Sequence, residues 1–414
     1  MENSIYRNKK KNNSANGIFA FLYLFYLVWR TPFVGFYTNT YLAMLVLMGF
    51  CALLLFVKNR WTIQSFVFLF LIIVVTILDF ISNIVDGKGF IMSIWEMFLA
   101  VFPIIAGCCI VNNRMNFVAR KFVFVSIIVY VITAITTFIG VLRFPGASRL
   151  LAADPLAHLK FYPLNIGGFD FIYSLVLLHP LAVYLLRKLK RTHYAIPFSI
   201  IALGCIIVCE YTMAVILYII SLLAYLLPID MNPVAAKRRM RNIVIASVIL
   251  IVFVPLIFSF LSKIEFLGSV GEKLFDISSL LQGETVQEES GVAIRQNIYL
   301  KSWNAFLERP IIGSKLYGTP TVGGHSYILD TLGNWGVMGL VVVLLLFNRL
   351  RIFYKKTFKN KETYYCASIF LLMVFILWTL NPKIWQFEIG LMCPVFLYCI
   401  ENTEHIIPRR KRRR

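Results

Sequence analysis

The stretch from Thr62 to Ser82 reads TIQSFVFLFLIIVVTILDFIS and contains one ionisable residue, Asp79. About 20 consecutive apolar residues are needed to cross the ~30 Å hydrocarbon core of a bilayer as a helix. Runs of this kind recur along a chain that is 59% hydrophobic and has a mean hydropathy of +0.77, whereas a soluble domain is nearer half apolar. A spanning barrel would show ~10-residue segments of alternating polarity, which this sequence lacks. We therefore predict an all-α polytopic membrane protein.

The apolar runs predict about twelve transmembrane helices. They lie near residues 17–35, 40–57, 62–82, 90–111, 122–142, 170–187, 195–209, 211–228, 242–262, 327–347, 364–380 and 385–400. The run from Ala195 to Pro228 is too long for one helix, and Glu210 near its middle predicts two short spans with an outside turn. A single span there would invert every later assignment and would place the basic segment 349–361 outside.

The formal net charge is +21, and its distribution indicates topology rather than nucleic-acid binding. Most Lys and Arg lie in short clusters between apolar runs, and each cluster falls in an alternate connection. Because cytoplasmic connections carry the excess of Lys and Arg, both termini are expected in the cytoplasm. The expected parts are a cytoplasmic segment 1–16, a membrane domain 17–400 and a basic cytoplasmic tail 401–414 that binds anionic lipid. We expect a retained first span, since no cleavage pattern follows it.

Two outside connections, 143–169 and 263–326, are long, and loops of that size are usually functional or disordered. The second is expected to contain a helix from Val292 to Arg309, closed by Pro310. The spacing of Arg295, Tyr299, Ser302 and Phe306 places these side chains on one face of that helix. A glycine-rich run then leads to His325 at the start of the next span.

Several signatures of nucleotide and metal chemistry are absent from the sequence. It contains no Walker A loop, no GxGxxG before a helix, no HExxH and no Asp-x-Asp pair. The 8 cysteines lie within or at the ends of predicted spans, without the spacing of a zinc site, and are read as small buried apolar residues. We therefore expect no metal and no cofactor, and a bound diphosphate would be held by Arg or Lys through charge-assisted hydrogen bonds.

His325 is the titratable group with the most distinctive position. It precedes the first turn of a span that begins Ser326-Tyr327-Ile328, and the electropositive helix N-terminus disfavours the protonated ring. A neutral imidazole can accept a proton from a hydroxyl group. The alternative is an interfacial histidine that only solvates a helix end. Ionisable side chains inside spans are functional candidates by default, and here they include Asp79, Glu96, Glu210 and Asp330.

One segment resembles a known signature. It runs Arg295-x7-Trp303, then Pro310-Ile311-Ile312-Gly313, then His325-Ser326-x2-Leu329-x2-Leu332-Gly333-x2-Gly336-x2-Gly339. It resembles the C-terminal signature of bacterial O-antigen and capsular polysaccharide polymerases (Wzy-type) and the related O-antigen ligases. The stretches Ala147-Ser148-Arg149-Leu150 and Pro163-Leu164-Asn165-x-Gly167 resemble the Arg and Pro-Asn elements of that family. One departure is that many members have a Ser-Arg pair where this chain has Thr212-Met213, so Arg149 or Arg143 would have to supply the charge.

The resemblance implies a GT-C-like membrane fold with one large extracytoplasmic loop that carries short helices. It implies inverting glycosyl transfer, without metal, on the outer face of the bacterial cytoplasmic membrane. Donor and acceptor would be glycans on undecaprenyl diphosphate, and the implied partners also include membrane lipids and a chain-length regulator protein. Arg295 and His325 are then the expected catalytic residues. Substrate-binding residues are expected at Arg149, Arg143, Tyr299 and Asp330.

Two other functions fit the same topology. A ligase that moves finished glycan to another acceptor would use the same donor chemistry. A lipid-linked oligosaccharide flippase or other transporter would place cationic residues along a central cavity and would need no long outside loop. The concentration of candidate residues in the predicted outside loops favours chemistry there over transport.

Overall fold

The computed structural model describes residues 17–38, 61–154, 156–226, 291–317 and 322–403, together with isolated positions between 42 and 53. The described residues form helices and no strand. After an apolar helix Gly17–Trp29, the elements are α2 Pro32–Tyr37, α4 Ile63–Val85, α5 Phe90–Asn112, α6 Asn116–Arg143, α7 Ala147–Ala153, α8 Ala157–Phe161, η1 Tyr162–Leu164, α9 Phe169–Lys188, α10 Thr192–Val208, α11 Thr212–Leu226, α14 Gly291–Glu308, η3 Lys315–Tyr317, α15 Tyr327–Thr357, α16 Lys361–Leu380, η4 Glu388–Met392 and α17 Cys393–Glu401.

Six of the described helices are long and apolar enough to cross a membrane, namely α4, α5, α6, α9, α15 and α16. Shorter apolar helices match the predicted spans near 17–35, 195–209 and 211–228. The predicted span 242–262 lies outside the described residues, as does most of 40–57. The prediction of a helical membrane protein is thus confirmed, while the expected number of spans stays a prediction.

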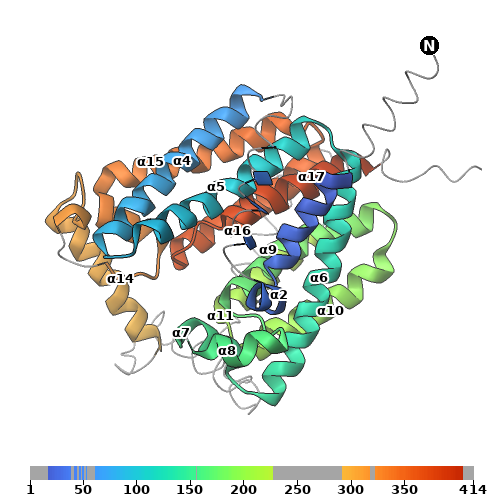
Figure 1. Cartoon of the computed structure of the whole chain (residues 1–414), viewed down its shortest axis with the longest axis horizontal. Helices are drawn as coiled ribbons and strands as arrows, with labels where there is room; N and C mark the ends of the chain where they lie inside the picture. The colour runs from blue at the N-terminus through green and yellow to red at the C-terminus, as the bar shows by residue number, and fades with distance from the viewer. Residues whose placement is uncertain are drawn as a thin grey trace, which may run out of the picture.

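Helix α9 lies at the centre of the bundle and packs against α10, α11, α16 and α17 (Figure 1). All its side chains from Ile172 to Leu186 are buried, as is typical of a helix that is apolar on every side. The outer helices differ, because α4 and α6 keep large exposed apolar side chains such as Phe66, Phe70 and Phe124. Such faces suit contact with lipid, where exposed apolar surface carries no hydration cost.

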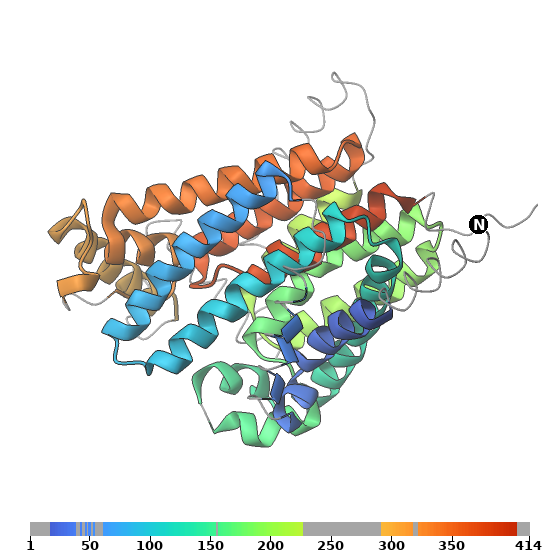
Figure 2. The same ribbon diagram turned by 45° about the horizontal axis from the view of Figure 1, so that its top comes forward.

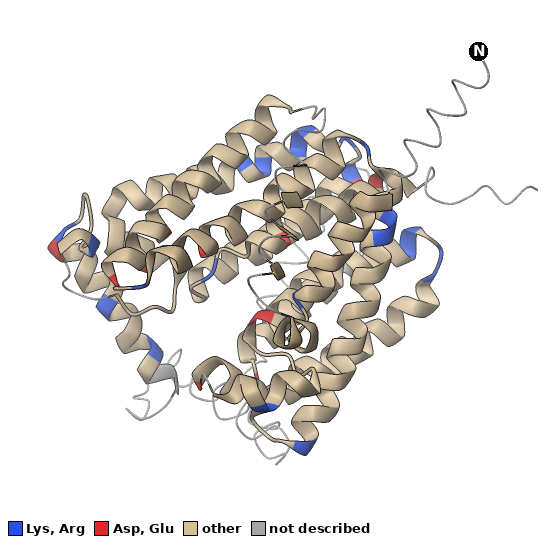
Figure 3. Cartoon of the chain, in the orientation of Figure 1, with Lys and Arg blue, Asp and Glu red and all other residues tan. Residues whose placement is uncertain are grey.

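The connections sort to two ends of the bundle. Lys and Arg gather where α5 meets α6, where α9 meets α10 and where α15 meets α16, along the upper and right-hand edges of Figure 3. The segment predicted as the outside loop 143–169 folds into α7, α8 and η1, and these lie with α14 toward the opposite end (Figures 1 and 2). This separation agrees with the charge pattern from which the topology was predicted.

The apolar run from Ala195 to Pro228 is divided as predicted. Helix α10 ends at Val208, α11 begins at Thr212, and Glu210 between them has a φ of 59°. A residue other than glycine rarely adopts this left-handed conformation, so the turn interrupts the helix.

Helix α15 is kinked rather than straight, which differs from the predicted continuous span. Gly336 has a φ of 61° and a ψ of −157° inside the helix. The turn 310–313 occupies the kink, where the amide of Val337 donates to the Pro310 carbonyl at 2.8 Å and the amide of Ser314 donates to the Gly333 carbonyl at 2.9 Å. A Cβ atom on Gly336 would lie 2.5 Å from the Ile311 carbonyl oxygen. The spaced glycines therefore admit the backbone of this turn, and the turn replaces hydrogen bonds that the kink removes.

The last predicted span is also interrupted. Trp385 has a φ of 62°, Gln386 and Phe387 are α-helical, a π-helical turn runs from Glu388 to Met392, and the α-helix resumes over Cys393–Glu401. Gly390 lies against α5 so closely that a Cβ atom on Gly107 would be 1.9 Å from the Gly390 carbonyl oxygen. π-Turns are frequent at functional sites. This irregular segment and the segment 381–387 before it are therefore candidate parts of a functional site.

Candidate functional site

A cavity of about 1080 Å³ lies at the end of the bundle that carries α7 and α14. Arg149, Arg295 and His325 all line it, although they come from α7, from α14 and from the residue before the cap of α15. The structure therefore brings together three of the six site residues that were predicted from sequence. Their separation along the chain is too large for a local sequence pattern to predict this.

Arg149 lies beside the turn that begins α11. Its Nη2 donates to the Glu210 carbonyl oxygen at 2.7 Å, its Nε is 3.9 Å from the Glu210 carboxylate, and its Cζ is 6.0 Å from the centroid of the Tyr211 ring. The Tyr211 hydroxyl fixes α7 in turn by donating to the Ser148 carbonyl at 2.9 Å. Arg149 thus places its charge beside the start of α11.

Arg143 is not brought to the cavity. It lies on the last turn of α6, is exposed, and stacks on the neighbouring Phe144 ring with 5.4 Å between Cζ and the ring centroid. Gly146, with a φ of 77°, reverses the chain between α6 and α7, so that residues close in sequence face different surroundings. The substrate-binding role expected for Arg143 has no support from its position.

Arg295 projects from the first half of α14, a helix that the sequence predicts within one residue at each end. It is exposed and makes no hydrogen bond or ion pair with another described residue. Tyr299, one turn later, is half-buried and does not line the cavity. Burial raises the pKa of Tyr299, Arg295 lowers it and Asp330 raises it further. The tyrosine therefore stays a neutral phenol near the charge of Arg295.

His325 is exposed, lines the cavity and makes one hydrogen bond through its ring. Its Nδ1 lies 2.9 Å from the Gly324 carbonyl oxygen, which can only accept a hydrogen bond. In the neutral form of the ring, Nδ1 therefore carries the hydrogen and Nε2 presents the lone pair. The next residue, Ser326, caps α15 by accepting from the Leu329 amide at 3.2 Å, in agreement with the predicted start of the helix.

Asp330 supports this loop rather than reaching the larger cavity. It is buried, and its Oδ1 accepts from the Ser302 hydroxyl at 2.6 Å and from the Gly324 amide at 3.1 Å. Its Oδ2 accepts from the Ser326 amide at 3.0 Å. Both amides that flank His325 are thus tied to one carboxylate. These hydrogen bonds give Asp330 a positioning role for the loop, and its substrate-binding role stays a prediction.

The structure adds residues that sequence reasoning did not assign to the site. Arg30, at the end of the first apolar helix, lines the cavity with its Cζ 4.3 Å from the centroid of the Phe387 ring. Lys383 also lines it and pairs with Asp170 at the start of α9. A charged residue late in an apolar run, as at Arg30, is a signal that sequence can offer. Lys383 and Asp170 lie at predicted span edges, where charge is ordinary.

The cavity is cationic and carries unsatisfied polar groups. Four lining residues bear a permanent positive charge against a single carboxylate, Asp170, which is itself paired. Several buried polar atoms on its walls have no hydrogen-bond partner among the described residues, namely Trp29 Nε1, Arg149 Nε, Thr212 Oγ1 and Asn381 Nδ2. Because buried polar groups in proteins are almost always hydrogen-bonded, such groups on a cavity wall suit an anionic, hydrogen-bonding ligand.

Comparison with known proteins adds no family: no family model and no curated protein matches this chain. Among the described residues, no group of three or more His, Cys, Asp and Glu side chains could hold a metal ion.

Proposed function

We propose that this protein joins lipid-diphosphate-linked oligosaccharide repeat units into a polysaccharide, as Wzy-type polymerases do. The observation that carries the proposal is the convergence of Arg149, Arg295 and His325 on one cationic cavity. The resemblance of the sequence assigns a role to each of these residues, and their meeting in one cavity was not implied by their spacing. The position of Arg149 beside α11 also supports the view that it supplies the charge missing at Thr212-Met213.

In this proposal the donor diphosphate lies between the guanidinium groups of Arg295 and Arg149, and Arg30 adds a third. An acceptor hydroxyl attacks the anomeric carbon of the donor from the face opposite the diphosphate. The new C–O bond forms as the bond to the diphosphate breaks, and the leaving group takes that electron pair. The acceptor proton passes to Nε2 of His325, which carries the lone pair in the neutral tautomer whose Nδ1 donates to Gly324. Guanidinium forks suit the diphosphate because they donate paired hydrogen bonds.

The test uses the purified protein in lipid with repeat units on undecaprenyl diphosphate, taken from cells that lack this protein. Arg295→Lys and Arg149→Lys each keep the charge but lose the fork. Losing one charge-assisted hydrogen bond costs roughly 1.5–3 kcal/mol, or about 10- to 150-fold in rate. Arg143→Lys is the matched control, since Arg143 lies outside the cavity, and it should polymerise at the wild-type rate.

His325→Ala should lose about 10²- to 10⁴-fold if the imidazole is the general base. His325→Gln can exchange hydrogen bonds but cannot take up the proton, so it should resemble His325→Ala. Wild-type turnover by His325→Ala, or equal effects of the Lys substitutions at positions 143 and 295, would contradict the proposal. In cells that lack the protein, glycans of a single repeat unit support a polymerase. Normal-length lipid-linked chains would indicate a ligase instead, and cytoplasmic retention of the donor would indicate a flippase.

A further inference from the structure

A second cavity, of about 650 Å³, adjoins the first. The two share the wall formed by Arg30, Asp170, Lys383 and Phe387. The loop before α15 also separates them, because His325 lines the first cavity whereas Gly324 and Tyr327 line the second. The candidate general base therefore lies at the boundary between two spaces of different chemistry.

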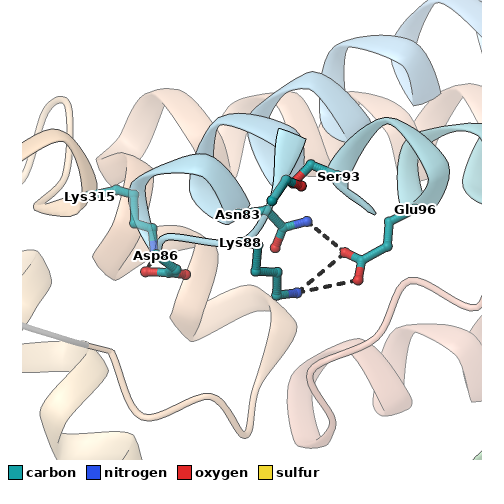
Figure 4. Close-up of polar contacts among 7 residues, drawn as sticks. Asn83, Asp86, Lys88, Ser93, Glu96 and Lys315 are labelled. Carbon is teal, nitrogen blue, oxygen red and sulfur yellow. Dashed lines mark hydrogen bonds and ion pairs between the residues drawn. The ribbon is translucent and has the colours of Figure 1, made fainter. Parts of the chain in front are cut away.

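Most charges of the second cavity are neutralised by neighbours, as Figure 4 shows for its outer edge. The Lys315 ammonium lies 2.7 Å from the Asp86 carboxylate, and Glu96 accepts from Asn83 Nδ2 at 2.7 Å and pairs with Lys88 at 3.3 Å. The Lys315–Asp86 pair fastens the segment after α14 to the α4–α5 hairpin, and the Glu96 contacts lie within that hairpin. They leave this edge without a cation to hold a phosphate.

Asp79 of α4 differs from these carboxylates. It lines the second cavity, is half-buried, and has no hydrogen bond or ion pair with a described residue. Two tryptophans, Trp335 and Trp385, line the same space. Trp385 is 4% exposed, and its indole Nε1 has no hydrogen-bond partner among the described residues. The side-chain amides of Asn334 and Gln386 complete a lining of acceptors, donors and aromatic faces.

We infer that this second cavity binds the sugar end of the acceptor glycan, an inference that rests on the proposed polymerase function. A sugar presents hydroxyl groups, which donate to carboxylates and exchange hydrogen bonds with amides, and an apolar ring face, which packs on aromatic rings. The carboxylates outnumber the cations on this wall, which disfavours a diphosphate. The volume lies within the ~300–1,000 Å³ typical of small-ligand sites.

The arrangement assigns each substrate to its own space. The donor diphosphate occupies the cationic cavity, the acceptor sugar occupies the carboxylate-lined one, and the acceptor hydroxyl reaches the donor past His325. Asp79 and Trp335 are then specificity-determining residues for the acceptor. They contribute nothing to the binding of the donor diphosphate.

Two binding probes separate the cavities in the full-length protein reconstituted in lipid nanodiscs. Undecaprenyl diphosphate tests the cationic cavity. The free repeat-unit oligosaccharide, released from its lipid by mild acid and lacking phosphate, tests the second cavity. Asp79→Asn and Trp335→Leu should each weaken oligosaccharide affinity about 10-fold, or about 1.4 kcal/mol, and leave undecaprenyl diphosphate affinity unchanged.

Arg295→Lys should show the opposite pattern, with weaker undecaprenyl diphosphate binding and unchanged oligosaccharide binding. Glu362→Gln is the matched control, because that carboxylate pairs with Lys188 at the basic end of the bundle, and it should alter neither affinity. Thermal unfolding in the same lipid verifies that each variant is folded.

The acceptor site is overturned if wild type shows no oligosaccharide binding, or if Asp79→Asn and Trp335→Leu bind the oligosaccharide as wild type does. The proposed function would still stand if undecaprenyl diphosphate binding depended on Arg295. If Arg295→Lys left the affinity for undecaprenyl diphosphate unchanged, the proposed function itself would be overturned.

Discussion

Asp330→Asn tests how the loop that carries His325 is held. The carboxylate accepts three hydrogen bonds, from the Ser302 hydroxyl and from the amides of Gly324 and Ser326. An asparagine side chain has one oxygen and one NH₂ group. If its oxygen keeps the two hydrogen bonds that Oδ1 accepts, its NH₂ group faces the backbone N–H of Ser326, and both of these groups are donors. Ser326 is fully buried, and its amide would have no acceptor.

The expected cost follows from these three contacts. Leaving one buried donor unsatisfied costs about 1–3 kcal/mol. The two remaining bonds become neutral rather than charge-assisted, and they lose about half their strength. The loop should therefore lose roughly 2–4 kcal/mol, which is about 30- to 700-fold in its opening equilibrium. The effect is local, since α15 keeps its own hydrogen-bond ladder beyond the first turn.

Hydrogen exchange measured by mass spectrometry reports this opening directly. Exchange in the peptide 322–330 should accelerate by the stated factor, because protection of these amides follows the free energy of local opening. Asp154→Asn is the matched control, since Asp154 also accepts a backbone amide, that of Leu156 at 2.8 Å, but is exposed. Unchanged exchange in 322–330 for Asp330→Asn would refute the positioning role.

Two further predictions concern the fold. Gly336→Ala should destabilise the protein by roughly 2–5 kcal/mol, because the new Cβ would clash with the turn 310–313 and because residue 336 has a positive φ. The melting temperature in detergent should fall accordingly. Gly89→Ala is the control, since a Cβ there meets open space, and it should melt as wild type does. Cysteines at Lys301 and Lys356, in a background without native cysteine, should differ in labelling by an impermeant thiol reagent, with Lys301 reached from outside. Equal labelling of the two positions would reject the proposed orientation.

Local features of this protein were predictable from sequence because they depend on neighbouring residues. The helix expected over 292–309 forms over Gly291–Glu308, since its polar face and the proline after it are local signals. The break at Glu210 and the start of a span near Ser326 are of the same kind. Hydrocarbon thickness sets the length of an apolar helix, so that composition alone indicated a helical membrane protein.

Which residues line the candidate site was decided by the tertiary structure. Arg143 and Arg149 were equivalent candidates in the sequence, and the left-handed turn at Gly146 directs one outward and the other to the cavity. Asp330 looked like a ligand for substrate, yet its two oxygens are taken by the loop that it supports. Arg30 joins residues that lie more than a hundred positions away. Hydrogen-bonding patterns and apolar spacing act over a few residues, whereas a cavity is defined by which helix ends meet, and only packing of the whole bundle decides that.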